Sequence, residues 1–298
     1  MKKKIILPIV LLLVLLAAGI IWLIKDKNIL EYVERNAANR QETWCEDYKV
    51  ISHALGGIDG IDYTNSYEAL EFSYEKGQRV VEADFLFTSD GALVLRHYWE
   101  DDLGQENFDG SAPTLEEFKA MPIFSVYTPM TAEELAAYMS SHGDLYLVTD
   151  VKHKMKSTTF EDTMKEFVKI AKETDASILK RVIVQIYCED DYKKMEKIYP
   201  FESYIFTLYK LPKEYKDQYG KIAEFCKKNG ISVVTMPAKW VKEKSDIEEL
   251  TGNDIKVYVH TVNEYEEAVK LLEMGVSGIY TDYLYESDFQ DMDVDEQN

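Results

Sequence analysis

The sequence predicts an α/β fold in which eight parallel strands close into a (β/α)8 barrel, also called a TIM barrel. Apolar, β-branched runs alternate with helical patterns along most of the chain, which is typical of a parallel sheet. The runs that are separated by helical patterns number eight, which is the number that closes such a barrel. They lie at residues 48–53, 79–85, 144–151, 181–187, 204–208, 231–235, 255–260 and 277–281.

Helical patterns between these strands are expected to form the outer ring of the barrel. They lie at 67–76, 160–174, 191–198, 215–229, 245–250 and 264–274. Residues 28–47 are polar and compatible with a stalk or a barrel-closing helix, and the acidic tail at 286–298 is expected to fray. We therefore expect one barrel domain at 48–285.

One further apolar run, at 92–97, does not fit the barrel count. Too few residues separate it from the strand at 79–85 for a crossover helix, and the pair Asp90–Gly91 between them is a turn signal. We therefore expect a hairpin that extends the second strand beyond the barrel rim, with Asp84 roughly opposite His97.

Residues 98–143 then form a helical insertion over that rim. A Thr followed three residues later by Glu is a capping signal for the start of a helix. The signal occurs at Thr114 and at Thr131, so we expect a helix to begin at each.

The N-terminal segment predicts a membrane anchor. Residues 5–24 are apolar or nearly so and carry no charge, which is long enough for a helix that crosses a bilayer. Three lysines precede the segment and a weaker positive charge follows it, which places the N-terminus in the cytoplasm. A cleaved signal peptide is the alternative, but its apolar core is usually shorter and has an A-x-A site. We expect residues 1–27 to be an uncleaved single-pass anchor, with the barrel outside the cytoplasm.

The charge of the chain excludes some partners. It has 34 basic and 54 acidic residues, and beyond residue 27 the net charge is −24. Such a surface binds nucleic acid poorly and is repelled by anionic lipid headgroups. An anionic substrate would need a local positive site, such as a metal ion. The three cysteines show no CxxC spacing, so we expect neither a disulfide framework nor any bridge.

Candidate functional residues lie where the predicted strands end, because active sites of such barrels form at the C-terminal ends of the strands. The polar side chains there are His53, Glu82, Asp84, His97, Asp150, Lys152, Gln185, Tyr187 and His260.

These residue types suggest phosphate-ester chemistry. Glu82, Asp84 and Asp150 are three carboxylates on two strands with no thiolate nearby, which favours a hard cation such as Ca²⁺ or Mg²⁺. His53 and His97 beside such a cation suit proton transfer near neutral pH. With Lys152 added, the set can neutralise phosphoryl oxygens, activate a nucleophile and protonate a leaving oxygen.

The run from His53 to His97 resembles the glycerophosphodiester phosphodiesterase family, whose barrel belongs with those of the phosphatidylinositol-specific phospholipases C. The family has His-Arg-Gly, an Asn-Thr-type segment, Glu-x-Asp, Thr-x-Asp-Gly and a second His. This chain has His53, TNSYEAL at 64–70, EAD at 82–84, TSDG at 88–91 and His97. Further on, TDVK at 149–152, HTVN at 260–263 and GVSGIYTDY at 275–283 resemble its later motifs, in the family's order.

The resemblance implies a role for each matching residue. Glu82, Asp84 and Asp150 would be the metal ligands, and Lys152 would contact the phosphate. His53 and His97 would be the acid/base pair. Two positions depart from the pattern: Ala54 stands where the family has Arg after the first His, and Tyr98 stands where Asp commonly follows the second.

The remaining candidates are residues of the substrate pocket. We expect Gln185 and Tyr187 either to line the pocket or to have only a packing role in the barrel. Trp99 follows His97 closely enough to contact substrate, and His260 is a wall residue where the resembling motif has Trp.

The leading functional hypothesis is a membrane-anchored, metal-dependent phosphodiesterase outside the cytoplasm. Its substrates would be glycerophosphodiesters or related glycerol-phosphate-containing lipids or polymers, attacked by water or by a neighbouring substrate hydroxyl. One alternative is a weak or inactive barrel that binds a phosphodiester or cell-wall polymer. Another is a phospholipase-type lyase that forms a cyclic phosphate.

Overall fold

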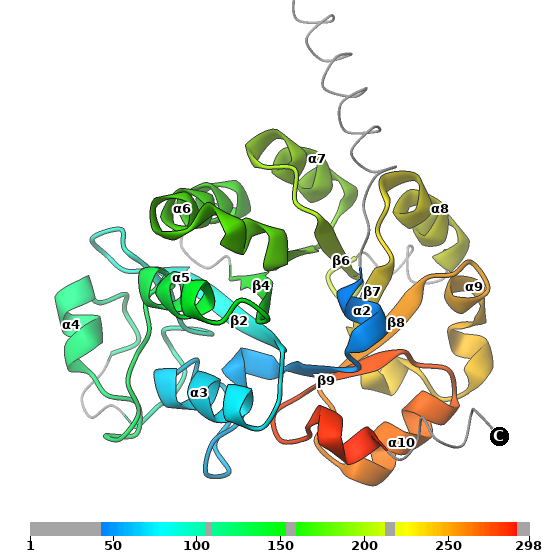
Figure 1. The fold of residues 1–298 in the computed structure, drawn as a ribbon, viewed down its shortest axis with the longest axis horizontal. Helices are drawn as coiled ribbons and strands as arrows, with labels where there is room; N and C mark the ends of the chain where they lie inside the picture. The colour runs from blue at the N-terminus through cyan, green and yellow to red at the C-terminus, as the bar shows by residue number, and fades with distance from the viewer. Residues whose placement is uncertain (1–42, 105–108, 153–158, 212–217, 291–298) are drawn as a thin grey trace, which may run out of the picture.

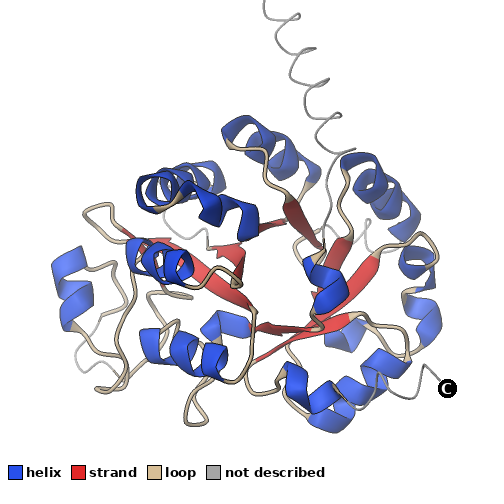
Figure 2. Cartoon of the chain, viewed as in Figure 1, coloured by secondary structure: helices blue, strands red, loops and turns tan. Residues whose placement is uncertain are grey.

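The computed structural model describes residues 43–104, 109–152, 159–211 and 218–290. Eight parallel strands form a closed barrel in the order β1-β9-β8-β7-β6-β5-β4-β2, and β1 pairs with β2 to close it. The predicted fold class is confirmed, and Figure 1 and Figure 2 show the helices surrounding the strands. The strands are β1 (Val50–Ser52), β2 (Val80–Phe87), β4 (Tyr146–Val151), β5 (Val182–Ile186), β6 (Ser203–Thr207), β7 (Val233–Pro237), β8 (Lys256–His260) and β9 (Gly278–Thr281).

The surrounding helices begin and end close to the expected positions, because capping residues mark several of their ends. Thr159 caps α6 through the backbone N–H of Asp162, and Gly230 ends α8 in the left-handed conformation at φ 64°. The helices are α3 (Tyr67–Glu75), α5 (Ala132–Ser141), α6 (Phe160–Thr174), α7 (Glu189–Ile198), α8 (Tyr219–Asn229), α9 (Glu248–Thr251) and α10 (Tyr265–Glu273).

Two apolar layers hold the barrel together. One lies between the strands and the ring helices. The other fills the barrel interior, where the short helix α2 (Trp44–Asp47) contributes Trp44, whose ring lies 5.5 Å from that of Tyr258. In Figure 1, α2 lies over the middle of the barrel, so residues at the end of the predicted stalk segment close the barrel on this side.

The predicted hairpin is present, with a register that differs by one residue from the expected one. Strand β3 (Leu93–Leu95) pairs antiparallel with β2, with Phe85 opposite Leu95. Arg96, and not His97, therefore faces Asp84, and its backbone N–H donates to the Asp84 carbonyl at 3.0 Å. His97 follows the end of the strand.

The two helices predicted in the insertion have different surroundings. Thr114 caps α4 (Leu115–Ala120) and Thr131 caps α5, each in a capping box with a Glu. Helix α4 lies outside the ring in Figure 1, whereas α5 packs beside α6 and against β3. Helix α5 therefore acts as the ring helix between β2 and β4 rather than as a cover over the rim.

The predicted membrane anchor at 5–24 lies outside the described residues. Within the described ranges, no helix combines the length and the apolar character that crossing a membrane requires.

Candidate active site

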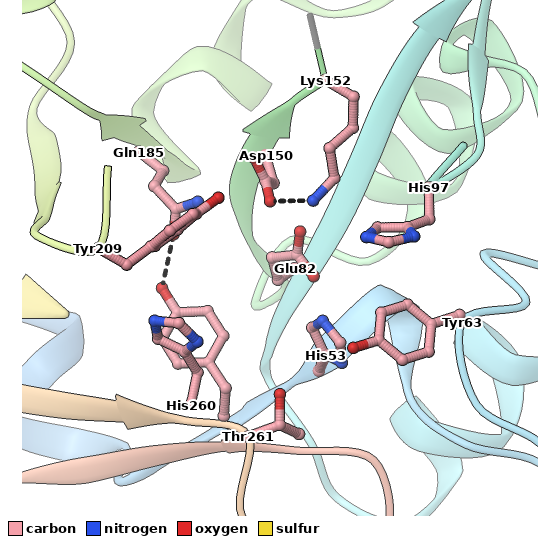
Figure 3. Close-up of a pocket in the computed structure, with 11 residues that line it drawn as sticks. His53, Tyr63, Glu82, His97, Asp150, Lys152, Gln185, Tyr209, His260 and Thr261 are labelled. Atoms are coloured by element: carbon pink, nitrogen blue, oxygen red, sulfur yellow. Dashed lines mark hydrogen bonds and ion pairs between the residues drawn. The ribbon is translucent and has the colours of Figure 1, made fainter. Parts of the chain in front are cut away.

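Polar side chains from several strand ends gather around one cavity of about 160 Å³ (Figure 3). The barrel produces this arrangement because the C-terminal ends of parallel strands meet on one face. The cavity is lined by His53, Tyr63, Glu82, His97, Asp150, Lys152, Gln185, Tyr209, His260, Thr261 and Tyr280.

Three buried carboxylates lie together beside the cavity. Glu82 and Asp84 lie on one face of β2, and Asp150 on β4 pairs in register with Asp84. Each carboxylate offers an oxygen atom within 4.8 Å of the other two. Ala54 N donates to one oxygen of Glu82 at 2.8 Å, and Asn65 Nδ2 donates to Asp84 at 2.9 Å.

The donor set fits a divalent metal ion. Among the described residues, the Oε1 atom of Glu82 is buried with no hydrogen-bond partner, which is costly unless a cation or a proton compensates it. Three hard oxygen ligands are the chemistry that Ca²⁺ and Mg²⁺ prefer. Burial, together with the charge of Asp84, raises the pKa of Glu82 to about 8.

Lys152 neutralises part of this negative charge. Its Nζ atom lies 3.0 Å from Oδ1 of Asp84 and 2.5 Å from Oδ2 of Asp150. Burial would lower the pKa of Lys152, but the two carboxylates outweigh it and raise the pKa above its ordinary value. Burial likewise opposes ionisation of Asp150, yet the charge and hydrogen bond of Lys152 lower the pKa of that carboxyl. Lys152 is therefore a permanently charged partner of the cluster.

His53 is held by a carboxylate on its far side. It follows β1 in a short 3₁₀ turn, and its Nδ1 lies 2.9 Å from Oδ1 of Asp282 at the end of β9. Asn263 fixes this carboxylate by donating from Nδ2 to its other oxygen at 2.7 Å. Burial would lower the pKa of His53, but the bond to Asp282 and the charge of Glu82 raise it to about 9.

His97 has a similar partner. Its Nδ1 lies 2.8 Å from Oδ2 of Asp101, which also accepts a hydrogen bond from the backbone N–H of Tyr98 at 3.0 Å. Both histidines thus have Nδ1 paired with a carboxylate, which is the arrangement that orients an imidazole and leaves Nε2 for chemistry.

The glycines after His53 allow the loop to approach β9. Gly57 donates its backbone N–H to the carbonyl of Asp282 at 2.7 Å. A Cβ at Gly57 would lie 2.2 Å from Cε1 of Tyr283, and one at Gly56 would lie 2.1 Å from Oγ of Ser73. Gly57 therefore allows the loop to pack closely against Asp282 and Tyr283, and Gly56 allows it to pack closely against α3.

Three of the predicted pocket residues lie at or behind the cavity. Gln185 and His260 line it, and burial together with the charge of His53 lowers the pKa of His260 to about 4, so this imidazole is neutral. Tyr187 lies behind the cavity and donates its hydroxyl hydrogen bond to Asp150. Gln185 Nε2 donates to Tyr187 at 3.3 Å.

Trp99, which we expected to contact substrate, is not among the residues that line the cavity. Trp99 is buried with Leu86, Val94 and Phe118, and its ring meets that of Phe118 edge to face at 5.9 Å. The indole packs into an apolar cluster between β2, β3 and α4, so Trp99 is a core residue of the insertion.

Several residues of the site were missed at the sequence level. Asp282 directly follows β9, so the rule used for the other strand ends could have identified it. Asn65 and Asp101 support the carboxylates and His97 from loops. Tyr63 and Tyr209 line the cavity from loops, where no strand pattern identifies them.

A scan against protein-family models matched residues 59–286 to the glycerophosphoryl diester phosphodiesterase family. A search of curated proteins gave no match.

Solved structures show the same fold. A putative glycerophosphoryl diester phosphodiesterase from Silicibacter pomeroyi is 18% identical with a TM-score of 0.63, over 84% of this chain and 94% of that one. A glycerophosphodiester phosphodiesterase from Parabacteroides distasonis is 20% identical with a TM-score of 0.64, over 84% and 98%. A phosphodiesterase from Oleispira antarctica, solved with its product sn-glycerol-3-phosphate, is 17% identical with a TM-score of 0.65, over 83% and 97%.

Proposed function

Because the chain belongs to the glycerophosphoryl diester phosphodiesterase family, we propose that it hydrolyses glycerophosphodiesters or related glycerol-phosphate-containing lipids or polymers. The observation that carries the proposal is the pair of histidines, His53 and His97, each backed by a carboxylate, beside a cluster of three buried carboxylates. The relative that was solved with sn-glycerol-3-phosphate supports the substrate class.

In the proposed reaction the two histidines move the protons. One accepts the proton of the attacking hydroxyl group through Nε2, and the other donates a proton to the leaving oxygen. Asp282 and Asp101 keep the two imidazoles oriented. Nucleophiles from water and from a neighbouring substrate hydroxyl are both compatible with this pair.

Glu82, Asp84 and Asp150 would hold the divalent cation, Ca²⁺ or Mg²⁺, which when bound neutralises charge on the phosphoryl group. Lys152 contributes a second positive charge, and it can contact the phosphate once it releases its present carboxylate partners. Gln185 and the neutral His260 contribute polar, uncharged contacts on another side of the cavity (Figure 3).

The test is to incubate the full chain with glycerophosphodiesters, phospholipids and teichoic-type polymers, with and without Ca²⁺ or Mg²⁺, and to identify the products. We expect cation-dependent release of a phosphomonoester. A cyclic phosphate as final product would instead indicate the lyase. Binding without turnover would indicate an inactive barrel. This alternative is favoured by Ala54, which stands where the family has Arg.

Two variants and a control assign the chemistry. His53→Ala and His97→Ala should each lower the rate by at least about 100-fold, the usual contribution of a general acid or base. His142→Ala is the matched control, because His142 lies in a groove on the outside of the barrel. Full activity in either active-site variant would refute the assignment.

We also propose that the protein is anchored in the membrane with the barrel outside the cytoplasm. The support is the uncharged apolar segment at 5–24 with lysines before it. Membrane fractionation and protease accessibility of intact cells test this, and recovery of the full chain in the soluble fraction would contradict it.

A further inference from the structure

Tyr63 lies between the two histidines. Its ring centroid lies 4.6 Å from that of His53, edge to face, and 4.7 Å from that of His97. Figure 3 shows the phenol entering from the loop side with its hydroxyl directed into the cavity. Within the described ranges this hydroxyl makes no hydrogen bond, so it is available to a ligand.

The loop that carries Tyr63 is held by hydrogen bonds to β2. The backbone of Tyr63 has φ 56°, a left-handed conformation that is costly for an aromatic residue and that persists only where the surroundings hold it. Two residues later, Oδ1 of Asn65 accepts a hydrogen bond from the backbone N–H of Asp84 at 3.1 Å. Nδ2 of Asn65 donates a hydrogen bond to the Asp84 carboxylate at 2.9 Å. The phenol is therefore positioned before any ligand arrives.

The cavity has few positive groups for an anionic substrate. Lys152 is the only lysine or arginine among the described residues that line it, and its ammonium group already contacts Asp84 and Asp150. The residue after His53 is Ala54, whose buried methyl group donates nothing. A phosphodiester with two non-bridging oxygens would thus benefit from a further donor.

We propose that the Tyr63 hydroxyl donates a hydrogen bond to a non-bridging phosphate oxygen of the bound diester, while its ring keeps His53 and His97 apart. This inference rests on the proposed function. Burial and the charge of Asp282 raise the pKa of Tyr63 to about 12, so the phenol stays a donor across the neutral range.

The test variant is Tyr63→Phe, which removes the hydroxyl and keeps the ring between the histidines. A hydrogen bond to a charged group corresponds to a loss of about 10- to 100-fold, so kcat/KM should fall by that factor. The affinity for sn-glycerol 3-phosphate, measured by calorimetry with Ca²⁺ present, should fall by a similar factor. The pH profile should keep its shape, because the imidazoles keep their ring contact.

Tyr265→Phe is the matched control, because Tyr265 is exposed on α10 and should change neither quantity. If the wild type turns over a diester and Tyr63→Phe has the same kcat/KM and the same affinity for sn-glycerol 3-phosphate, the role of Tyr63 is refuted. The proposed function is then unaffected. If the wild type neither turns over any diester nor binds sn-glycerol 3-phosphate, the proposed function fails together with this inference. Weaker binding by Tyr63→Phe supports the role of Tyr63 even without turnover.

Discussion

Nδ1 of His53 lies 2.9 Å from Oδ1 of Asp282, although 229 positions separate the two residues in the chain. The pairing of β1 with β9 joins the first and the last strand of the barrel and brings both strand ends to one place. The orientation of His53 therefore depends on closure of the whole domain. The proton on Nδ1 is assigned from the carboxylate partner, which leaves Nε2 as the reactive nitrogen.

Asp282→Asn should lower kcat strongly. An amide in place of the carboxylate no longer selects the tautomer and no longer stabilises the charged imidazole, so we expect a loss of at least about 100-fold. Steady-state kinetics on a diester that the wild type hydrolyses measures this. Asp254→Asn is the control, because Asp254 is exposed. A loss of less than a few-fold in Asp282→Asn would show that His53 needs no carboxylate.

The same variant has a pH-dependent effect on stability in the cation-free protein. The folded state raises the pKa of His53 from 6.5 to about 9. Charged His53 therefore stabilises the fold fully below pH about 6.5, and this stabilisation is lost as the pH rises through about 9. Urea denaturation with chelator should show a large wild-type advantage over Asp282→Asn at pH 6.5 and a smaller one at pH 9.5. An advantage that is constant over this range would contradict the pairing.

Cation affinity should rise with pH because Glu82 must lose its proton to become a ligand. The pKa of Glu82 is raised to about 8, so below this pH a proton competes with the metal ion. Calorimetric titration with Ca²⁺ should show affinity that increases between pH 6 and pH 8, with proton release in this range. Glu82→Gln should bind more weakly and lose this pH dependence; a pH-independent wild-type affinity would exclude Glu82 as a ligand.

The sequence predicted the strands of the barrel because each is a continuous apolar run, and the hairpin because Asp90–Gly91 is a strong turn signal. The register of the hairpin could not be predicted to one residue. The turn is closed by a backbone hydrogen bond from Thr88 N–H to the Ala92 carbonyl and by one from Gly91 N–H to the Thr88 carbonyl, and the resulting pairing places Asp84 opposite Arg96. Register depends on turn geometry, which the pattern of apolar residues does not contain.

The site was partly predictable for the same reason. Residues at strand ends, such as Glu82 and Asp150, follow from the barrel topology. Tyr63 lies in a loop with left-handed backbone, and Trp99 turns into an apolar cluster that only the packing of α4 creates. Side-chain direction in irregular segments depends on tertiary contacts that local pattern does not encode.

Gly57→Ala should destabilise the protein although the change is one methyl group. The added Cβ would lie 2.2 Å from the Tyr283 ring and 2.9 Å from the Asp282 carbonyl, so the loop or β9 must shift. We expect about 1–3 kcal/mol of lost unfolding free energy, the usual cost of overpacking, together with reduced activity as His53 moves. Gly143→Ala is the control, since its Cβ would meet open space. Equal urea midpoints for the two variants would contradict the packing argument.

Lys152→Met should make the folded protein depend on a divalent cation. Lys152 contacts Asp84 and Asp150, and its removal from protein without a bound cation leaves buried charge unpaired, which typically costs about 3–5 kcal/mol. A bound cation can replace the lost charge, so Ca²⁺ or Mg²⁺ should raise the melting temperature more in this variant than in the wild type. Thermal denaturation with chelator and with saturating cation measures the rise in melting temperature for each protein.

Lys165→Met is the control, because the ammonium group of Lys165 lies on the surface beside Glu161. This variant should respond as the wild type does. Equal increments in all three proteins would mean that Lys152 and the cation do not share the carboxylates.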